Sequence, residues 1–168
     1  MIVSTKHGDI RIVVEHDSMS KDFYLKAKTE HGTKMGSLTF SVEKDKNQTW
    51  LNIVETENGY KHRGVGTALL TAMEFISERK FGISQIIGTF MPYIKTRRNP
   101  FKPVNKQKIE EFTKHFYEVN GYDVNVYTSI LKKPLVKKQK DYSKLVDCSY
   151  AEFMSFGIDY DAMEEWQR

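Results

Sequence analysis

Hydrophobic and polar residues alternate in two segments near the beginning of the chain, residues 22–28 and 38–42. A period of two places the apolar side chains on one face of a β-strand. The apolar members of the two segments are Phe23, Leu25, Ala27, Leu38, Phe40 and Val42. A turn over residues 30–36 with two glycines separates them, so the pattern predicts a β-hairpin with one buried face.

Two further strands are predicted on either side of this hairpin. Residues 10–15 form a compact run rich in β-branched residues, and residues 49–56 follow a polar turn at residues 44–48. Consecutive strands with short connections usually lie side by side, so the first third of the chain predicts an antiparallel meander.

The hydrophobic period changes after Gly66. Leu69, Met73 and Ile76 recur at helical spacing, and Gly82 stands where a helix C-terminus is expected. Residues 84–90 then form another strand-like run. A strand, a helix and a second strand predict a crossover, with residues 84–90 parallel to residues 49–56.

The second half of the chain contains a long loop, a helix and a closing strand. Residues 91–107 contain three prolines, which exclude a regular helix or a central strand, and five basic residues without an acidic one. Such a loop is often functional, and a solvated insertion is an equal alternative. Residues 108–120 have apolar residues at helical spacing and stop before Gly121, and residues 127–133 are predicted as the final strand, before Pro134.

A basic turn with two close glycines lies between the strand at residues 49–56 and the following helix. Its residues are Lys61, His62, Arg63, Gly64, Val65, Gly66 and Thr67. The free N–H groups of a first helical turn and the helix dipole bind anions, and glycine lets backbone approach the ligand closely. The dinucleotide fingerprint needs a small residue where Leu69 stands, and the Gly-Lys-Ser/Thr of a P-loop does not occur in the sequence. The turn therefore predicts another kind of phosphate site, and a simple basic helix entry is the alternative.

Two sequence motifs resemble those of the GCN5-related N-acetyltransferase (GNAT) superfamily. Residues 61–66 fit its motif A, Gln/Arg-x-x-Gly-x-Gly/Ala, except that Lys61 stands for Gln or Arg. Residues 116–122, Phe-Tyr-Glu-Val-Asn-Gly-Tyr, match its motif B signature, Phe/Leu-Tyr-Glu-x-x-Gly-Phe/Tyr, place for place. The resemblance covers roughly residues 49–135. It implies the GNAT fold, an α/β or α+β architecture with a mixed, mostly antiparallel sheet and one strand–helix–strand crossover.

The resemblance also implies acetyl-CoA as the cofactor and assigns the coenzyme A contacts. The amides of Gly64, Val65, Gly66 and Thr67, with the basic residues Lys61, His62 and Arg63 ahead of them, would hold the pyrophosphate. The pantetheine arm would pair, like an added strand, with the backbone of Ile53, Val54 and Thr56. The gap between the strands at residues 49–56 and 84–90 would admit it.

Two residues are candidates for acid–base chemistry in acyl transfer to an amine. By resemblance Glu55 would remove the amine proton, directly or through water, although Glu57 or a solvated role for Glu55 is an equal alternative. Tyr117 matches the motif B tyrosine that would protonate the departing thiolate, and a core aromatic is the alternative. The sequence has no metal-ligand spacing, and its one cysteine, Cys148, is read as inert.

The sequence departs from the family pattern at both ends. Only residues 17–21 separate the first predicted strand from the next, so the helices that usually form one wall of the acceptor site are missing or reduced. We expect an acyltransferase domain at residues 1–135 and a tail at residues 136–168 with two short helices. This tail would pack on the domain or on a partner.

Composition and charge bound the cellular context. The 168 residues have a net charge of +4 and no apolar run long enough to span a membrane, so we expect a cytoplasmic protein without a membrane partner. The basic excess favours an anionic partner, such as coenzyme A, an anionic acceptor or nucleic acid. The acceptor contacts would come from the loop, through Lys95, Arg97, Arg98 and Lys102. A homodimer is left open.

These observations give two hypotheses for function. The first is an N-acetyltransferase that moves an acetyl group from acetyl-CoA to a primary amine by direct attack. The second is a catalytically silent module on the same fold that binds coenzyme A or nucleic acid. Neither the acceptor nor the length of the acyl chain follows from the sequence.

Overall fold

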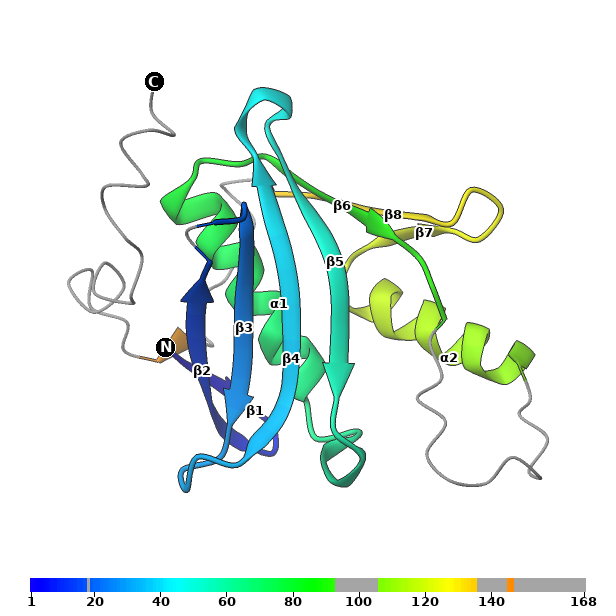
Figure 1. The fold of residues 1–168 in the computed structure, drawn as a ribbon. Helices are drawn as coiled ribbons and strands as arrows, with labels where there is room; N and C mark the ends of the chain where they lie inside the picture. The colour runs from blue at the N-terminus through cyan, green and yellow to red at the C-terminus, as the bar shows by residue number, and fades with distance from the viewer. Residues whose placement is uncertain (18, 93–105, 136–144, 147–168) are drawn as a thin grey trace.

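One mixed β-sheet of nine strands, with helix α1 packed against it, forms the body of the protein (Figure 1). The computed structural model describes residues 1–17, 19–92, 106–135 and 145–146. The strands are β1 Ile2–Thr5, β2 Gly8–His16, β3 Asp22–Lys28, β4 Lys34–Glu43, β5 Gln48–Thr56, β6 Gln85–Thr89, β7 Asp123–Asn125, β8 Ile130–Pro134 and β9 Leu145–Val146. The helices are α1 Val65–Phe75, its π-helical continuation Ile76–Lys80, and α2 Lys106–Val119, with 3-10 turns at Lys44–Lys46 and Asn58–Tyr60. The strand order is β7-β8-β6-β5-β4-β3-β2-β1-β9.

Strands β2 to β5 form the predicted antiparallel meander, and β1 adds one further antiparallel strand to it. Each strand pairs with the next, and Leu25 of β3 lies opposite Leu38 of β4. All six alternating apolar residues of β3 and β4 are buried, so the expected hairpin with one buried face is confirmed. Strand β1 was not predicted, because its four residues are too few and too mixed to show a period.

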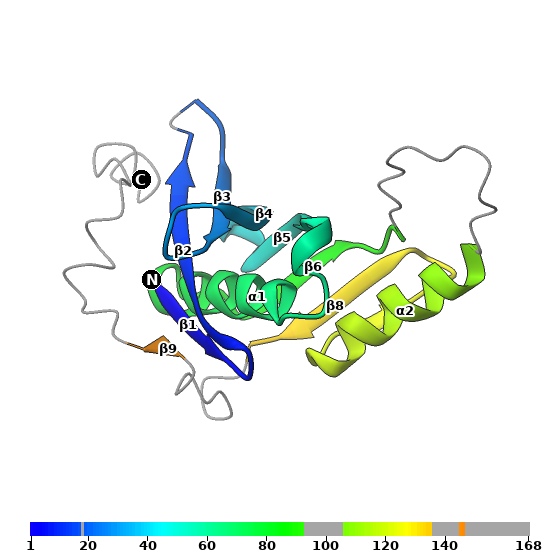
Figure 2. The same ribbon diagram turned by 90° about the horizontal axis from the view of Figure 1, so that it is seen from below.

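The crossover from β5 through α1 to β6 is also confirmed. Strand β6 pairs with β5 in parallel, and α1 buries Leu69 and Met73 against the sheet. Gly82 ends the helix: its N–H donates to the carbonyl of Glu78, and the next N–H, of Ile83, donates to Ser77. Figure 2 shows the sheet curving around α1.

The closing strands differ in extent from the sequence-based expectation. Residues 127–133 were predicted as one strand, but β8 begins at Ile130, because a turn with Ser129 at φ 54° precedes it. The short strand β7 was not predicted, and it pairs with β8 as a hairpin. Helix α2 starts at Lys106, two residues before its predicted start.

The sequence predicted two departures from the family pattern, reduced helices near the N-terminus and an added C-terminal tail. Among the described residues before α1, only the two 3-10 turns are helical, so the N-terminal helices are reduced, as expected. In Figure 1 the face of β2 to β5 that points away from α1 has no described helix in front of it. In the tail, the two expected helices lie outside the described residues. The described part contributes β9, which pairs antiparallel with β1. No helix in the described part of the chain is both long and apolar enough to cross a bilayer.

The core makes a direct stability prediction at Phe40. Its side chain is fully buried and stacks on Phe23 with ring centroids 5.1 Å apart. We expect Phe40→Ala to lower the free energy of unfolding by about 3 to 5 kcal/mol, because it removes apolar contacts and leaves a cavity. Thr39→Ala, on the opposite face of the same strand, is the matched control and should cost less than about 1 kcal/mol. Urea denaturation of both variants measures the difference, and equal losses would contradict this placement of the core.

Candidate functional site

The basic turn brings the first amides of α1 to the protein surface. Lys61, His62 and Arg63 are exposed, and Gly64 is the N-cap residue with φ 77°, a left-handed conformation that favours glycine. The first helical hydrogen bond runs from the N–H of Ala68 to the carbonyl of Gly64. The three amides before it, of residues 65–67, have no partner within the helix, and within the described part of the chain no hydrogen bond reaches them. Gly66 and Thr67 are part-exposed, so this end of α1 is open to an anion.

Close packing, in addition to backbone freedom, requires glycine in this region. A methyl group on Gly66 would lie 2.9 Å from Cζ of Phe116 in α2 and 3.8 Å from the hydroxyl of Thr56. The same group on Gly36 of β4 would lie 2.5 Å from the carbonyl oxygen of Glu55 and 2.9 Å from a methyl of Val65. Gly36 thus lets α1 approach the sheet. The sequence analysis placed Gly36 in the turn at residues 30–36, but β4 begins at Lys34, so this contact was not predicted.

Strand β5 leaves its parallel neighbour halfway along its length. Pairing with β6 runs from Gln48 to Leu51 and then stops. At the same place, the pairing of β5 with β4 is interrupted by a bulge, since Leu51 lies opposite Phe40 and Ile53 lies opposite Thr39. A bulge bends a strand and increases its twist. Residues 53–56 therefore pair with β4 only, and their other edge is free to pair with an extended ligand.

The residues predicted to contact pantetheine lie on this free half of β5. Ile53 is 41% exposed, whereas Val54 and Thr56 are half-buried. Thr56 lies on the α1 side of the sheet, where its hydroxyl approaches Gly66. The free edge of β5 and the open end of α1 therefore meet at Thr56.

Glu55 points to the other face of the sheet. It is paired with Ser37, and its neighbours in sequence, Val54 and Thr56, face α1. The carboxylate is half-buried and forms no ion pair or hydrogen bond within the described part of the chain. Glu57, the alternative base, lies beyond the end of β5 and forms an ion pair with Lys34 at 3.5 Å. The structure therefore gives the two carboxylates different surroundings.

Tyr117 lies on the α1 side of the sheet. It is 9% exposed, and its ring packs edge-on against Phe90, Phe116 and Tyr122. Burial raises the pKa of its phenol to about 12, so the hydroxyl stays protonated at neutral pH. Within the described residues this hydroxyl makes no hydrogen bond, which leaves it available as a donor. Glu55 and Tyr117 therefore lie on opposite faces of the sheet.

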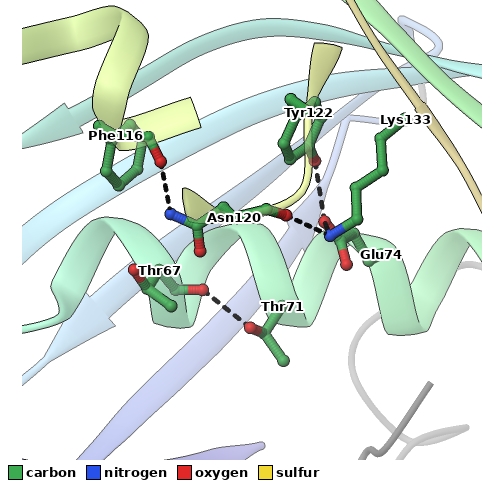
Figure 3. A network of polar contacts seen from close by, with 7 residues as sticks. All are labelled: Thr67, Thr71, Glu74, Phe116, Asn120, Tyr122 and Lys133. Atoms are coloured by element: carbon green, nitrogen blue, oxygen red, sulfur yellow. Dashed lines mark hydrogen bonds and ion pairs between the residues drawn. The ribbon is translucent and has the colours of Figure 1, made fainter. Parts of the chain in front are cut away.

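Two groups of residues near the site were not identified from the sequence. The first is an aromatic contact between His62 and Phe112 of α2, with ring centroids 5.2 Å apart. The second is a buried polar network in which Glu74 of α1 accepts hydrogen bonds from Tyr122 and Lys133 (Figure 3). Its sequence signal was weak: Glu74 directly follows Met73 on the predicted helix and so lies close to its apolar face. The basic loop residues Lys95, Arg97, Arg98 and Lys102 lie outside the described residues.

Comparison with known proteins adds information at the level of the fold. No protein-family model matches the sequence, and no curated protein matches it significantly. Many solved structures resemble it, among them three with a TM-score of 0.50. The first is the PaiA N-acetyltransferase of Thermoplasma acidophilum in complex with coenzyme A, with 22% identity, covering 70% of this chain and 63% of that one. The second is a GNAT-family acetyltransferase of Staphylococcus aureus, with 16% identity over 70% of each chain. The third is nourseothricin acetyltransferase, with 14% identity, covering 81% of this chain and 83% of that one.

The shared architecture agrees with the elements described above. At these identities the likeness concerns the fold, and this chain spans less than two thirds of the Thermoplasma protein. The sheet, the crossover through α1 and the motif positions at Gly64–Gly66 and Tyr117 agree with the resemblance seen in the sequence. The protein has the fold of the GCN5-related N-acetyltransferases, with reduced N-terminal helices.

Proposed function

We propose that this protein is an N-acetyltransferase that transfers an acetyl group from acetyl-CoA to a primary amine by direct attack. One observation carries the proposal: the open N-terminus of α1 and the free edge of β5 meet at Thr56. A pyrophosphate and an amide-bearing arm are the two parts of coenzyme A that these features fit. The Thermoplasma protein of the same fold was crystallised with coenzyme A, which supports the choice of ligand.

The binding residues would each supply one contact to coenzyme A. The amides of Gly66 and Thr67 would donate to the pyrophosphate, and Lys61 and Arg63 would add positive charge at the exposed rim. The free backbone edge of residues 53–56 would hydrogen bond to the amides of the arm. Acetyl-CoA supplies an acyl group that is already activated as a thioester.

The acid–base roles follow from the two faces of the sheet. Glu55 would accept the proton of the attacking amine on the face away from α1. Tyr117 would donate its phenolic proton to the departing sulfur from the α1 side, in a buried setting where a hydrogen bond to a developing negative charge is strong. The acyl–sulfur bond breaks as the acyl–nitrogen bond forms, so one proton leaves the amine and one reaches the sulfur.

The acceptor side is more open than the usual family pattern implies. No described helix covers the face of β2 to β5 on which Glu55 lies (Figure 1). The loop residues Lys95, Arg97, Arg98 and Lys102 remain our proposal for contacts with an anionic acceptor, or with the 3′-phosphate of coenzyme A. The silent coenzyme A-binding or nucleic-acid-binding module remains the competing function, and the experiments below distinguish it.

Charge reversal at Arg63 tests the cofactor site. We expect acetyl-CoA to raise the melting temperature of the wild type, and Arg63→Glu to weaken binding about tenfold, because a repulsive charge replaces an attractive one beside the pyrophosphate. Calorimetric titration measures the affinity. Arg11→Glu is the matched control, since Arg11 is an exposed strand residue on β2. Equal affinities for both variants would place the pyrophosphate elsewhere, and salt-dependent binding of RNA without binding of acetyl-CoA would favour the nucleic-acid module.

Removing one oxygen at Tyr117 tests the general acid. Tyr117→Phe keeps the buried ring and loses no hydrogen bond of the described structure, so the fold should be unchanged. We expect kcat to fall about 10²-fold or more, with unchanged affinity for acetyl-CoA. Thiol release with a panel of amines measures the rate, and Tyr127→Phe, at a fully exposed tyrosine, is the control. A Tyr117→Phe enzyme as fast as the wild type would exclude this role.

A pair of glutamine substitutions separates the two candidate bases. Glu55→Gln should lower kcat about 10²-fold, because an amide cannot accept the amine proton. Glu57→Gln should have little effect, because that carboxylate is paired with Lys34 beyond the end of the strand. The same thiol-release assay compares them under identical amine concentrations. The reverse order of effects would assign the base to Glu57, and wild-type binding without amine-dependent release would favour the silent module.

A further inference from the structure

Helix α2 packs against the core mainly through Phe116 and Tyr117, near its C-terminal end. Tyr117 is its only buried side chain within the described structure, whereas Phe112 is 57% exposed and Val119 is also exposed. Helices in proteins are usually held by packing of an apolar face. We therefore look for a polar interaction that acts together with Phe116 and Tyr117 at the C-terminal end of α2.

A buried ion pair provides that interaction. Lys133 of β8 lies 2.7 Å from a carboxylate oxygen of Glu74 in α1, and the two side chains are only 17% and 8% exposed. The same ammonium group donates to the carbonyl of Asn120, just beyond the end of α2, at 2.5 Å. Tyr122 completes the group by donating its hydroxyl to Glu74 at 3.0 Å. Figure 3 shows these side chains converging from α1, β8 and the end of α2.

This group is linked directly to Tyr117. The carbonyl of Tyr117 accepts hydrogen bonds from the N–H groups of Asn120 and Tyr122, at 3.1 and 3.0 Å. The rings of Tyr117 and Tyr122 pack edge-on with centroids 5.7 Å apart. Any shift of Asn120 or Tyr122 would therefore move Tyr117.

A buried ion pair contributes little net stability, because desolvation of both charges offsets their attraction, but its geometry is demanding. We propose that Glu74 and Lys133 are positioning residues that fix the end of α2 and thereby aim the Tyr117 hydroxyl at the departing sulfur. The proposal rests on the acetyltransferase function proposed above. Glu74 lies eight residues after Gly66, about 12 Å along α1, so the pair acts on the acid and leaves the pyrophosphate site intact.

Lys133→Met tests this role in the full-length protein. We expect kcat to fall about tenfold to a hundredfold, since a displacement near 1 Å of a catalytic group has effects of this size, while KM for acetyl-CoA changes by less than about twofold. Lys133→Arg should restore part of the rate, because it keeps the charge. Lys114→Met is the matched control. It also breaks a lysine–glutamate ion pair, but this pair, with Glu118 at 3.6 Å, lies within α2 and is half-exposed. A Lys133→Met variant with wild-type kcat would overturn the proposal.

A fully apolar version of the network separates positioning from stability. The triple variant Glu74→Leu/Tyr122→Phe/Lys133→Met removes both charges and the Tyr122 hydroxyl together, so no unpaired buried charge is left and its melting temperature should stay close to that of the wild type. We expect it to remain as slow as Lys133→Met. Recovery of wild-type kcat in this variant would show that the network has only a structural role and would overturn the proposal.

Hydrogen exchange gives a readout that does not depend on catalysis. In Lys133→Met the amides of Asn120, Gly121 and Tyr122 should exchange faster, whereas those in the middle of α1 should not change. Unchanged exchange at these three amides would overturn the positioning role. If the wild type itself shows no amine-dependent thiol release, the proposed function fails, and the exchange data still decide whether the ion pair fixes the end of α2.

Discussion

The bulge in β5 at Asn52 is the constraint on which the rest of the site depends. Before it, β5 pairs with β4 on one side and with β6 on the other, and its backbone groups are satisfied by the sheet. After it, the strand bends away from β6, and residues 53–56 keep one pairing edge free. The opening lies in the middle of the sheet, beside the start of α1. A sheet without this bulge would be closed where we propose that the thioester passes.

Helix α1 contacts α2 and the segment that follows it at two points. At the start of α1, the ring of Phe116 occupies the space beside Gly66. Near its C-terminal end, Glu74 binds Lys133 and Tyr122. One contact is apolar and lies next to the proposed pyrophosphate site, whereas the other is ionic and lies behind Tyr117. Substitutions at the two points should therefore affect binding and chemistry separately.

The uncovered face of β2 to β5 explains why the acceptor is harder to assign than the cofactor. The cofactor contacts are mostly backbone groups, and these are fixed by the fold itself. Acceptor contacts come from side chains on covering elements, and the described part of this chain has no helix on the face where Glu55 lies.

The sequence by itself determined the order of strands and helices from β2 to α2, because their hydrophobic periods differ clearly, and the two glycine-containing motifs located both ends of the candidate site. It could not give the end of β5–β6 pairing, the bulge, or the faces on which Glu55 and Tyr117 lie, since these depend on register between distant segments. Short elements such as β1 and β7 were missed because three or four residues show no period. The partnership of Glu74 with Lys133, 59 residues apart, also required the tertiary structure, because only packing brings two such charges together and removes them from water.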